Sequence, residues 1–377
     1  MGVSAWAAGF GRVPGARLSA VANPRWNSLN ALRLFFAGAV IVSHAWPIGG
    51  YGPDPEIAGV GLGGWAVAGF FSISGYLISS SRLKTPLLPF LWRRFLRIFP
   101  GLWMCLLVIA FVFVPIAVAT TGGGDGATTG VARFVGANAV LLHVEGIGGT
   151  LADVPYPNTW NGSLWTLFYE FACYLIVASI FTLGFVRRRP AMWLWVLFLG
   201  SVLVTTAVQE FDVGVPYRAI QLAYLGSFFW AGALLFVHAR QVPAGPMAAA
   251  GAFAVLVIIC LVGHVEELSA LPFAFLVLWL GFKLPLQRLG RRNDISYGVY
   301  IYAFPVQQLL VLAGAHHLGA GAYVPLCIAA TIPLAAASWF VVEKPALALK
   351  HVVEPRRVPA TDFEPEPVLT AATDPAR

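Results

Sequence analysis

The apolar segment LRLFFAGAVIVSHAWP contains an arginine near its start and a histidine near its end. Arg33 and His44 are eleven residues apart, which places their side chains about 20° apart around a helix and about 16 Å apart along its axis. Ionisable residues in apolar helices usually face a bundle interior or a water-filled cavity. The pair therefore predicts a helix face that lines a polar path. Two structural readings stay open: Arg33 could extend its charge to an interface, and His44 could hydrogen-bond to a loop.

A second charge in an apolar context is Glu170, in the segment NGSLWTLFYEF. It lies about 10 Å from the start of its helix, so its depth could match that of His44. A carboxylate in an apolar helix is costly without a partner, and an imidazole beside a carboxylate can act as an oriented base. The sequence therefore predicts His44 and Glu170 as the catalytic pair, with a purely structural pair as the alternative.

Three arginines lie close together in the segment FLWRRFLRIFPGLW. Arg93 and Arg97 are four residues apart and share a helix face, and Arg94 lies beside them. Clustered guanidinium groups suit a phosphorylated ligand. The same cluster could instead anchor a helix and bind anionic lipid headgroups.

The composition indicates that these residues are positioned by membrane helices. Of the 377 residues, 58% are hydrophobic and 11% are charged, whereas a soluble domain has about 25% charged residues. Residues 101–124 and 191–209 carry no charge, and a span needs roughly 20 apolar residues. Such long runs favour helices over the short alternating strands of a β-barrel. We therefore expect an all-α polytopic membrane protein.

Ten transmembrane helices are expected from the apolar runs, and residues 131–144 should form a further helix at the interface or packed on the bundle. The ten spans lie at about residues 29–48, 60–80, 99–120, 164–186, 191–208, 218–238, 246–263, 268–284, 295–314 and 322–341.

The basic residues predict the orientation of these spans. Of the 24 Lys and Arg residues, all but Arg33, Arg133 and Arg218 lie in the terminal segments, at a helix end or in connections on one side, including residues 81–98. Basic connections face the cytoplasm, so both termini should be cytoplasmic. The net charge of +7 then reflects topology, and no nucleic-acid partner is expected.

Three regions are expected along the chain. Residues 1–28 form a cytoplasmic N-terminal segment, and residues 29–347 form the transmembrane domain. Residues 348–377, rich in Pro, Glu and Ala, are predicted to be a disordered cytoplasmic tail. The outer loop at about 121–163 is long enough to be functional.

No metal site is expected. The four cysteines fall inside predicted spans without metal-ligand spacing, and they read as small hydrophobic residues. The adjacent pair His316 and His317 lies in a predicted outer loop and would not present both rings to one ion.

Several segments together resemble the acyltransferase-3 family of bacterial integral membrane acyltransferases. Arg33 and His44 resemble its Arg-(ten residues)-His motif, and Arg93 to Arg97 resemble its Arg-Arg-x-x-Arg motif. NGSLWTLFYE is similar to its Ser-Leu-Trp-x-Leu-x-x-Glu motif, with Glu170 as the acid. Similar matches are GFFSISGYLI (69–78), ISYGVYIYAFP (295–305) and VVEKPAL (341–347).

The resemblance implies an O-acyltransferase of the bacterial inner (cytoplasmic) membrane, surrounded by membrane lipids. Such an enzyme moves an acyl group, usually acetyl, from cytoplasmic acyl-CoA to a hydroxyl of a surface glycan or exopolysaccharide, or of its lipid-linked precursor. In this reading His44 and Glu170 are catalytic, and acyl-CoA is bound by Arg33, Arg93, Arg94 and Arg97. The acceptor is bound by Asn161, Ser163, Trp165 and Tyr297.

Other readings remain open at this stage. Tyr156, Asn158, Trp160 and Asn161 could bind a sugar by stacking and hydrogen bonds, or the aromatic residues could form an interfacial belt. The acceptor could be a small molecule or a lipid. In a different class of protein, Arg33, His44 and Glu170 would form the path of a proton-coupled transporter or flippase.

Overall fold

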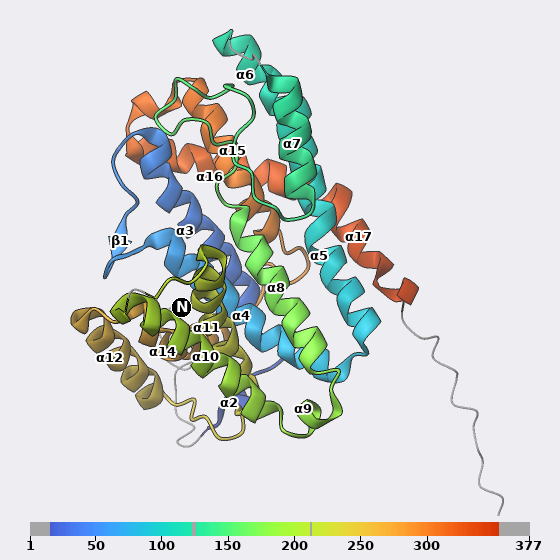
Figure 1. The fold of residues 1–377 in the computed structure, drawn as a ribbon, viewed down its shortest axis with the longest axis vertical. Helices are drawn as coiled ribbons and strands as arrows, with labels where there is room; N and C mark the ends of the chain where they lie inside the picture. The colour runs from blue at the N-terminus through green and yellow to red at the C-terminus, as the bar shows by residue number, and fades with distance from the viewer. Residues whose placement is uncertain (1–15, 123–125, 212, 354–377) are drawn as a thin grey trace, which may run out of the picture.

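The protein is a bundle of α-helices with a short β-hairpin near its N-terminal third (Figure 1). The computed structural model describes residues 16–122, 126–211 and 213–353. The hairpin pairs β1 (Glu56–Ile57) with β2 (Val60–Gly61) in antiparallel register. The predicted all-α class is therefore confirmed. The hairpin is confined to one connection between two helices.

The helices of the described residues follow each other with mostly short connections. They are α2 (Leu18–Val21), α3 (Leu29–Gly49), α4 (Leu62–Lys84), α5 (Leu87–Val108), η1 (Ile109–Phe113), α6 (Val114–Thr121), α7 (Ala127–Ala139), α8 (Trp165–Ile180), α9 (Gly184–Arg188), α10 (Pro190–Phe211), α11 (Tyr217–Val237), α12 (Pro246–Val262), α13 (Val265–Leu268), α14 (Ala270–Lys283), α15 (Ser296–Leu312), η2 (Ala315–Leu318), α16 (Ala320–Ser338), η3 (Trp339–Glu343), α17 (Lys344–Ala348) and η4 (Leu349–Val353).

Many of these helices are apolar enough for a membrane, and the chain is a multi-pass membrane protein. Within the described residues, six are long enough to cross it, and three shorter apolar helices accompany them: Trp165–Ile180, Pro246–Val262 and Ala270–Lys283. Each of the ten predicted spans overlaps a helix, and the span predicted at 164–186 is divided between α8 and α9. The count of ten spans and the cytoplasmic termini stay predictions.

Residues 81–98, predicted to lie on the cytoplasmic side with Arg93 and Arg97 on one helix face, are mostly helical, and their side of the membrane stays a prediction. Helix α4 continues to Lys84, and a helix of 35 residues runs from Leu87 to Thr121 through α5, η1 and α6. This helix is about 52 Å long, whereas the hydrocarbon core of a membrane is about 30 Å thick. The first turns of this helix hold the arginine cluster. They can therefore extend beyond the apolar layer while remaining helical.

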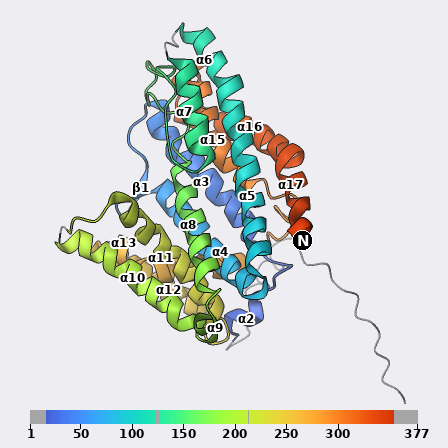
Figure 2. The same cartoon turned by 45° about the vertical axis from the view of Figure 1, so that its right-hand side comes forward.

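Helices α3 and α4 form the centre of the bundle (Figures 1 and 2). Helix α11 packs on α4, α15 and α16 pack on α3, and α8 lies against α4 and α5. A Cβ atom on Gly75 of α4 would lie 1.8 Å from the backbone oxygen of Phe229 in α11. Small residues let membrane helices approach this closely, so Gly75 sets the separation of α4 and α11.

The helix expected within residues 131–144 is confirmed as α7, which ends at Ala139 and packs on α5, where the Trp103 indole donates a 3.0 Å hydrogen bond to the Ala139 oxygen. The segment predicted as a disordered tail, 348–377, begins in an ordered stretch, because η4 packs on α5 and the Leu349 oxygen accepts a 2.9 Å hydrogen bond from Trp92. Residues 354–377 lie outside the described residues.

The bundle has two ends that matter for function. Helix α3 begins at the end where α5 also begins, which we call the arginine end. It runs toward the opposite end of the bundle, which carries α6 and the 140–164 segment and which we call the loop end (Figure 1). Arg33 is one turn into α3, and His44 is in its last two turns, so the same helix connects the two ends.

Candidate active site

At the arginine end, two arginines share one carboxylate. Arg33 of α3 and Arg97 of α5 place guanidinium nitrogens 3.0 Å and 2.6 Å from Oδ2 of Asp294. The hydroxyl of Ser296 donates a 2.6 Å hydrogen bond to the other carboxylate oxygen. Burial opposes ionisation of Asp294, but both arginines and Ser296 outweigh it and lower its pKa to about 2. The carboxylate therefore holds two helices together through their cations.

The other two predicted arginines lie on the adjoining turns of α5. The guanidinium of Arg94 lies 5.8 Å from the centre of the Phe90 ring and 6.0 Å from that of Tyr174, which is cation–π geometry. Arg93 is partly buried one helical turn before Arg97. The structure thus brings Arg33 and Arg97 together, whereas Arg94 faces α8.

Glu170 lies on α8 and is held by two hydroxyl groups. Ser74 of α4 donates a 2.9 Å hydrogen bond to its Oε1, and the hydroxyl of Tyr174 donates to the same oxygen. Together with Arg33, Tyr297 and Tyr300, it lines a small cavity of about 30 Å³.

The predicted pair of His44 and Glu170 is not formed. Within the part of the chain that the structure describes, Glu170 accepts hydrogen bonds from Ser74 and Tyr174, and the buried Nδ1 of His44 has no hydrogen-bond partner. The two residues line different cavities. The pair does not form because Ser74 of α4 and Tyr174 of α8 already donate hydrogen bonds to the Glu170 carboxylate.

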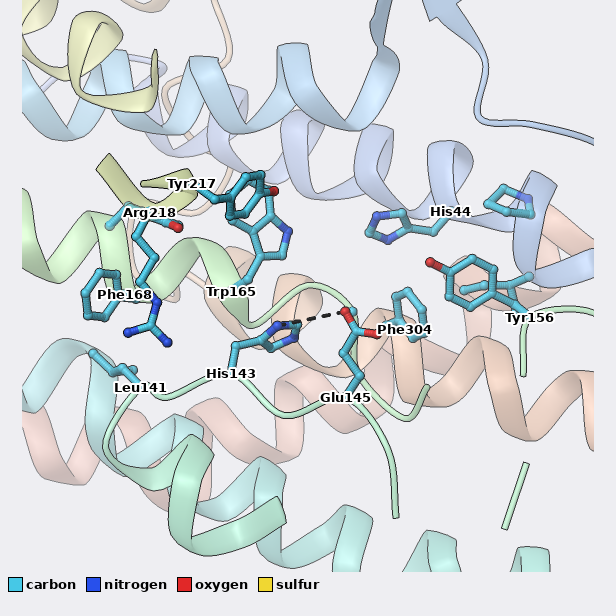
Figure 3. A pocket seen from close by; sticks show the side chains of 14 residues that line it. His44, Leu141, His143, Glu145, Tyr156, Trp165, Phe168, Tyr217, Arg218 and Phe304 are labelled. Atoms are coloured by element: carbon cyan, nitrogen blue, oxygen red, sulfur yellow. Dashed lines mark ion pairs between the residues drawn. The ribbon is translucent and has the colours of Figure 1, made fainter. Parts of the chain in front are cut away.

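His44 faces a larger cavity of about 470 Å³ at the loop end, which we call the loop-end cavity (Figure 3). Its ring packs edge-on against Phe304, with ring centres 5.2 Å apart. Helices α3, α8, α11 and α15 and the 141–162 segment all contribute to the wall. The lining residues are His44, Pro47, Ile48, Leu141, His143, Glu145, Tyr156, Gly162, Trp165, Phe168, Tyr169, Tyr217, Arg218 and Phe304.

A second histidine, which the sequence reasoning missed, lies in this wall beside a carboxylate. Nε2 of His143 is 3.3 Å from the backbone oxygen of Asn161, and Nδ1 is 3.9 Å from Oε1 of Glu145 (Figure 3). The signal in the sequence was the run LLHVEG in the long outer loop, where His143 and Glu145 are two residues apart.

Arg218 was also missed as a site residue. It extends from the first turn of α11 into the cavity wall, with its guanidinium 5.6 Å from the centre of the Phe168 ring. The wall therefore combines aromatic faces with groups of both charges.

The predicted acceptor residues fall into three places. Trp165 lines the loop-end cavity, and Tyr297 lines the small cavity beside Glu170. Asn161 and Ser163 are 0% and 1% exposed. Asn161 donates a 2.8 Å hydrogen bond to the Ile301 oxygen and accepts one of 3.1 Å from the Ser163 amide.

These contacts place Asn161 and Ser163 beneath the cavity wall, where they tie the loop to α15. Trp160 is likewise buried, and its indole donates a 2.7 Å hydrogen bond to Thr150. Tyr156 lines the loop-end cavity.

One group of potential metal ligands occurs among the described residues. Glu210, His264 and Glu267 place ligand atoms within 4.8 Å of one another at the end of α10 and around α13. None of the three lines the loop-end cavity or the small cavity beside Glu170.

Comparison with known proteins identifies the family. The family model described as an acyltransferase domain, that of acyltransferase-3, matches residues 26–340. The chain belongs to the acyltransferase-3 family. The match covers α3 to α16 and includes the arginine network and both cavities, and the protein is accordingly an acyltransferase of the membrane.

Two curated relatives cover nearly the whole of this acyltransferase. One is an O-acetyl transferase of Shigella phage Sf6, 28% identical over 334 residues, which are 84% of this chain and 95% of the relative. The other is Nodulation protein 10 of Rhizobium leguminosarum bv. viciae, 28% identical over 369 residues, which are 88% and 96% of the two chains. No solved structure matches the chain.

Proposed function

We propose that this acyltransferase moves an acetyl group from acetyl-CoA to a hydroxyl of a surface glycan or its lipid-linked precursor. The relative from phage Sf6, named an O-acetyl transferase, supports the choice of acetyl and of an oxygen acceptor. The enzyme lies in the inner membrane of a bacterium, with the arginine end toward the cytoplasm, where acyl-CoA is found.

The donor binds at the arginine end. The phosphate groups of CoA suit guanidinium groups because both can form several charge-assisted hydrogen bonds. Arg33 and Arg97 are already held side by side by Asp294, so the two cations are preorganised. Arg93 and Arg94, on the adjoining turns of α5, extend the positive surface. No metal takes part in this scheme.

The acceptor binds in the loop-end cavity. Its volume of about 470 Å³ is within the usual range of small-ligand sites, roughly 300–1,000 Å³. Aromatic faces such as Tyr156 and Trp165 suit the apolar faces of a sugar ring, and the polar groups beside them suit hydroxyls. Asn161 and Ser163 act as positioning residues, because they hold the wall from beneath.

The observation that carries the proposal is the placement of Arg33 and His44 on one helix. Arg33 joins the cation network at the arginine end, and His44 faces the loop-end cavity, about 16 Å farther along α3. The pantetheine arm of CoA separates the thioester from the phosphates over a long distance. A donor held at Arg33 can thus direct its acyl group toward His44.

The test compares membranes containing the protein with membranes of the His44→Ala variant. Both receive radiolabelled acetyl-CoA and a crude extract of surface glycans, and label in the glycan fraction is measured. We expect transfer to fall by at least about 100-fold in the variant, while the protein remains in the membrane. The exposed His317 does not line the cavity, so His317→Ala is the matched control and should keep full activity.

Transfer by His44→Ala at the rate of the unaltered protein would remove His44 from the mechanism. If label enters a lipid or a small molecule instead of a glycan, the acetyl-transfer reaction stands and the proposed acceptor is wrong.

A further inference from the structure

Two imidazole rings face the loop-end cavity, and their surroundings differ. His44 comes from α3, and its buried Nδ1 has no hydrogen-bond partner among the described residues. His143 comes from the opposite wall, where a backbone oxygen and a carboxylate flank its two ring nitrogens. A general base needs a partner that fixes its tautomer and stabilises its cation. His143 has such partners, whereas no described residue bonds to the buried Nδ1 of His44.

The contacts of His143 define which of its nitrogens can accept a proton. Nε2 is 3.3 Å from the Asn161 oxygen, and a carbonyl oxygen can only accept, so Nε2 carries the hydrogen of the neutral ring. Nδ1 then holds the lone pair. Glu145, 3.9 Å from Nδ1, is too far for a direct hydrogen bond but close enough to stabilise the imidazolium after Nδ1 gains a proton.

We propose that His143 is the general base that deprotonates the acceptor hydroxyl, and that His44 carries the acyl group to it. This assignment rests on the proposed function and adds a second catalytic residue to it. The division of work has a simple chemical reason. Acylation withdraws electron density from the imidazole of His44 and makes its remaining nitrogen lone pair a much weaker base, so the acceptor hydroxyl needs another base in the second step.

The reaction then has two balanced steps. First, a ring nitrogen of His44 attacks the thioester carbonyl, the C–S bond breaks, and CoA leaves as the thiol with the proton that His44 gives up. Second, the acceptor hydroxyl passes its proton to Nδ1 of His143 while its oxygen attacks the acyl carbon. The C–N bond to His44 breaks, and His143 returns the proton to the ring of His44. The products are the ester and both histidines in their starting state.

The cavity provides room for this arrangement. The side chain of His143 is 21% exposed, and the ring borders the same space of about 470 Å³ as His44. A sugar ring between the two histidines can therefore offer its hydroxyl to one and meet the acyl carbon on the other. Tyr156 and Trp165 close the two sides of this space (Figure 3).

The test uses the full-length protein in membranes and separates the two steps. His143→Gln keeps an amide N–H that can donate to the Asn161 oxygen but removes the base. With radiolabelled acetyl-CoA we measure label on the protein, released by hydroxylamine, and label on the glycan. We expect His143→Gln to retain protein label and to lose glycan transfer by about 100-fold or more. His44→Ala should lose both, and the control His317→Gln should lose neither.

A second variant guards against a purely structural effect. His143→Ala leaves a gap beside an open cavity, and added imidazole should restore part of its glycan transfer while doing nothing for His44→Ala. Glu145→Gln should slow glycan transfer less than His143→Gln does, because Glu145 acts through His143.

The outcomes distinguish a failure of the proposed function from a failure of the assignment of His143 as the general base. If the unaltered protein transfers no label to any acceptor, the proposed function fails. If it does and His143→Gln matches it within twofold, the assignment of His143 fails while the proposed function stands. Loss of protein label in His143→Gln, without rescue of His143→Ala by imidazole, also overturns the assignment.

Discussion

At the scale of single residues, Asp294 shows how one carboxylate can organise a site. Its Oδ2 contacts guanidinium groups from two helices that are far apart in sequence, and its pKa is lowered to about 2. Without it, Arg33 and Arg97 would repel each other in a poorly solvated place. Under the proposed function, a CoA phosphate competes with Asp294 for these two guanidinium groups.

This network predicts a specific pH dependence of stability. The folded protein holds the ionised form of Asp294 more strongly than the unfolded chain, whose pKa is near 3.8. Ionised Asp294 therefore contributes on the order of 2 kcal/mol to the free energy of unfolding above about pH 4. This contribution is lost as the pH falls toward about 2. Thermal unfolding of the unaltered protein and of Asp294→Asn in detergent, from pH 6 to pH 2.5, should give a difference that shrinks below pH 4. A constant difference over that range would contradict the role assigned to Asp294.

The sequence predicted part of this residue-level picture. Helical spacing placed Arg33 and His44 on one face and predicted that charged groups in apolar helices would line cavities, and both do. It did not identify Asp294, which directly precedes the segment ISYGVY, because a single acid in a basic connection has no periodic signal. It also paired Glu170 with the wrong partner, since Ser74 and Tyr174 are ordinary residues of apolar helices until the fold brings them to the carboxylate.

At the scale of elements, the packing of α4 on α11 explains the role of residues 69–78, which residue spacing in the sequence does not show. The run GFFSISGYLI supplies Ser74, which binds Glu170, and Gly75, which lets α11 approach. Both functions depend on neighbours from other helices. Helix positions were predictable from apolar runs, whereas the early start of α5 was not, because its first turns are amphipathic and charged.

Gly75→Ala tests this packing directly. The added methyl group would lie 1.8 Å from the Phe229 oxygen, so the helices must separate, at a cost of about 1–3 kcal/mol. Gly38 of α3 has no atom within 4 Å of the position of a Cβ, so Gly38→Ala is the matched control. We expect a clearly lower melting temperature in detergent for Gly75→Ala and no loss for Gly38→Ala. Equal melting temperatures would show that the contact does not set the helix separation.

At the scale of the whole molecule, the two sites lie at opposite ends of α3. The arginine end holds the cations and the loop-end cavity holds the two histidines. The proposed function therefore allows donor and acceptor to bind from opposite sides of the membrane. The apolar composition predicted a membrane protein, and the spacing of Arg33 and His44 predicted a polar path, whereas in the structure the two residues line separate cavities. The loop-end cavity could not be predicted, because its wall combines four helices with an irregular segment.

The most direct test places donor and acceptor on opposite sides of a sealed membrane. Purified protein is reconstituted into liposomes, the two orientations are distinguished by protease access to the termini, and radiolabelled acetyl-CoA is supplied to one compartment and glycan acceptor to the other. The account predicts labelled glycan when acetyl-CoA faces the arginine end and the acceptor faces the loop end, and none with His44→Ala. Transfer that occurs only when both substrates share one compartment would contradict it.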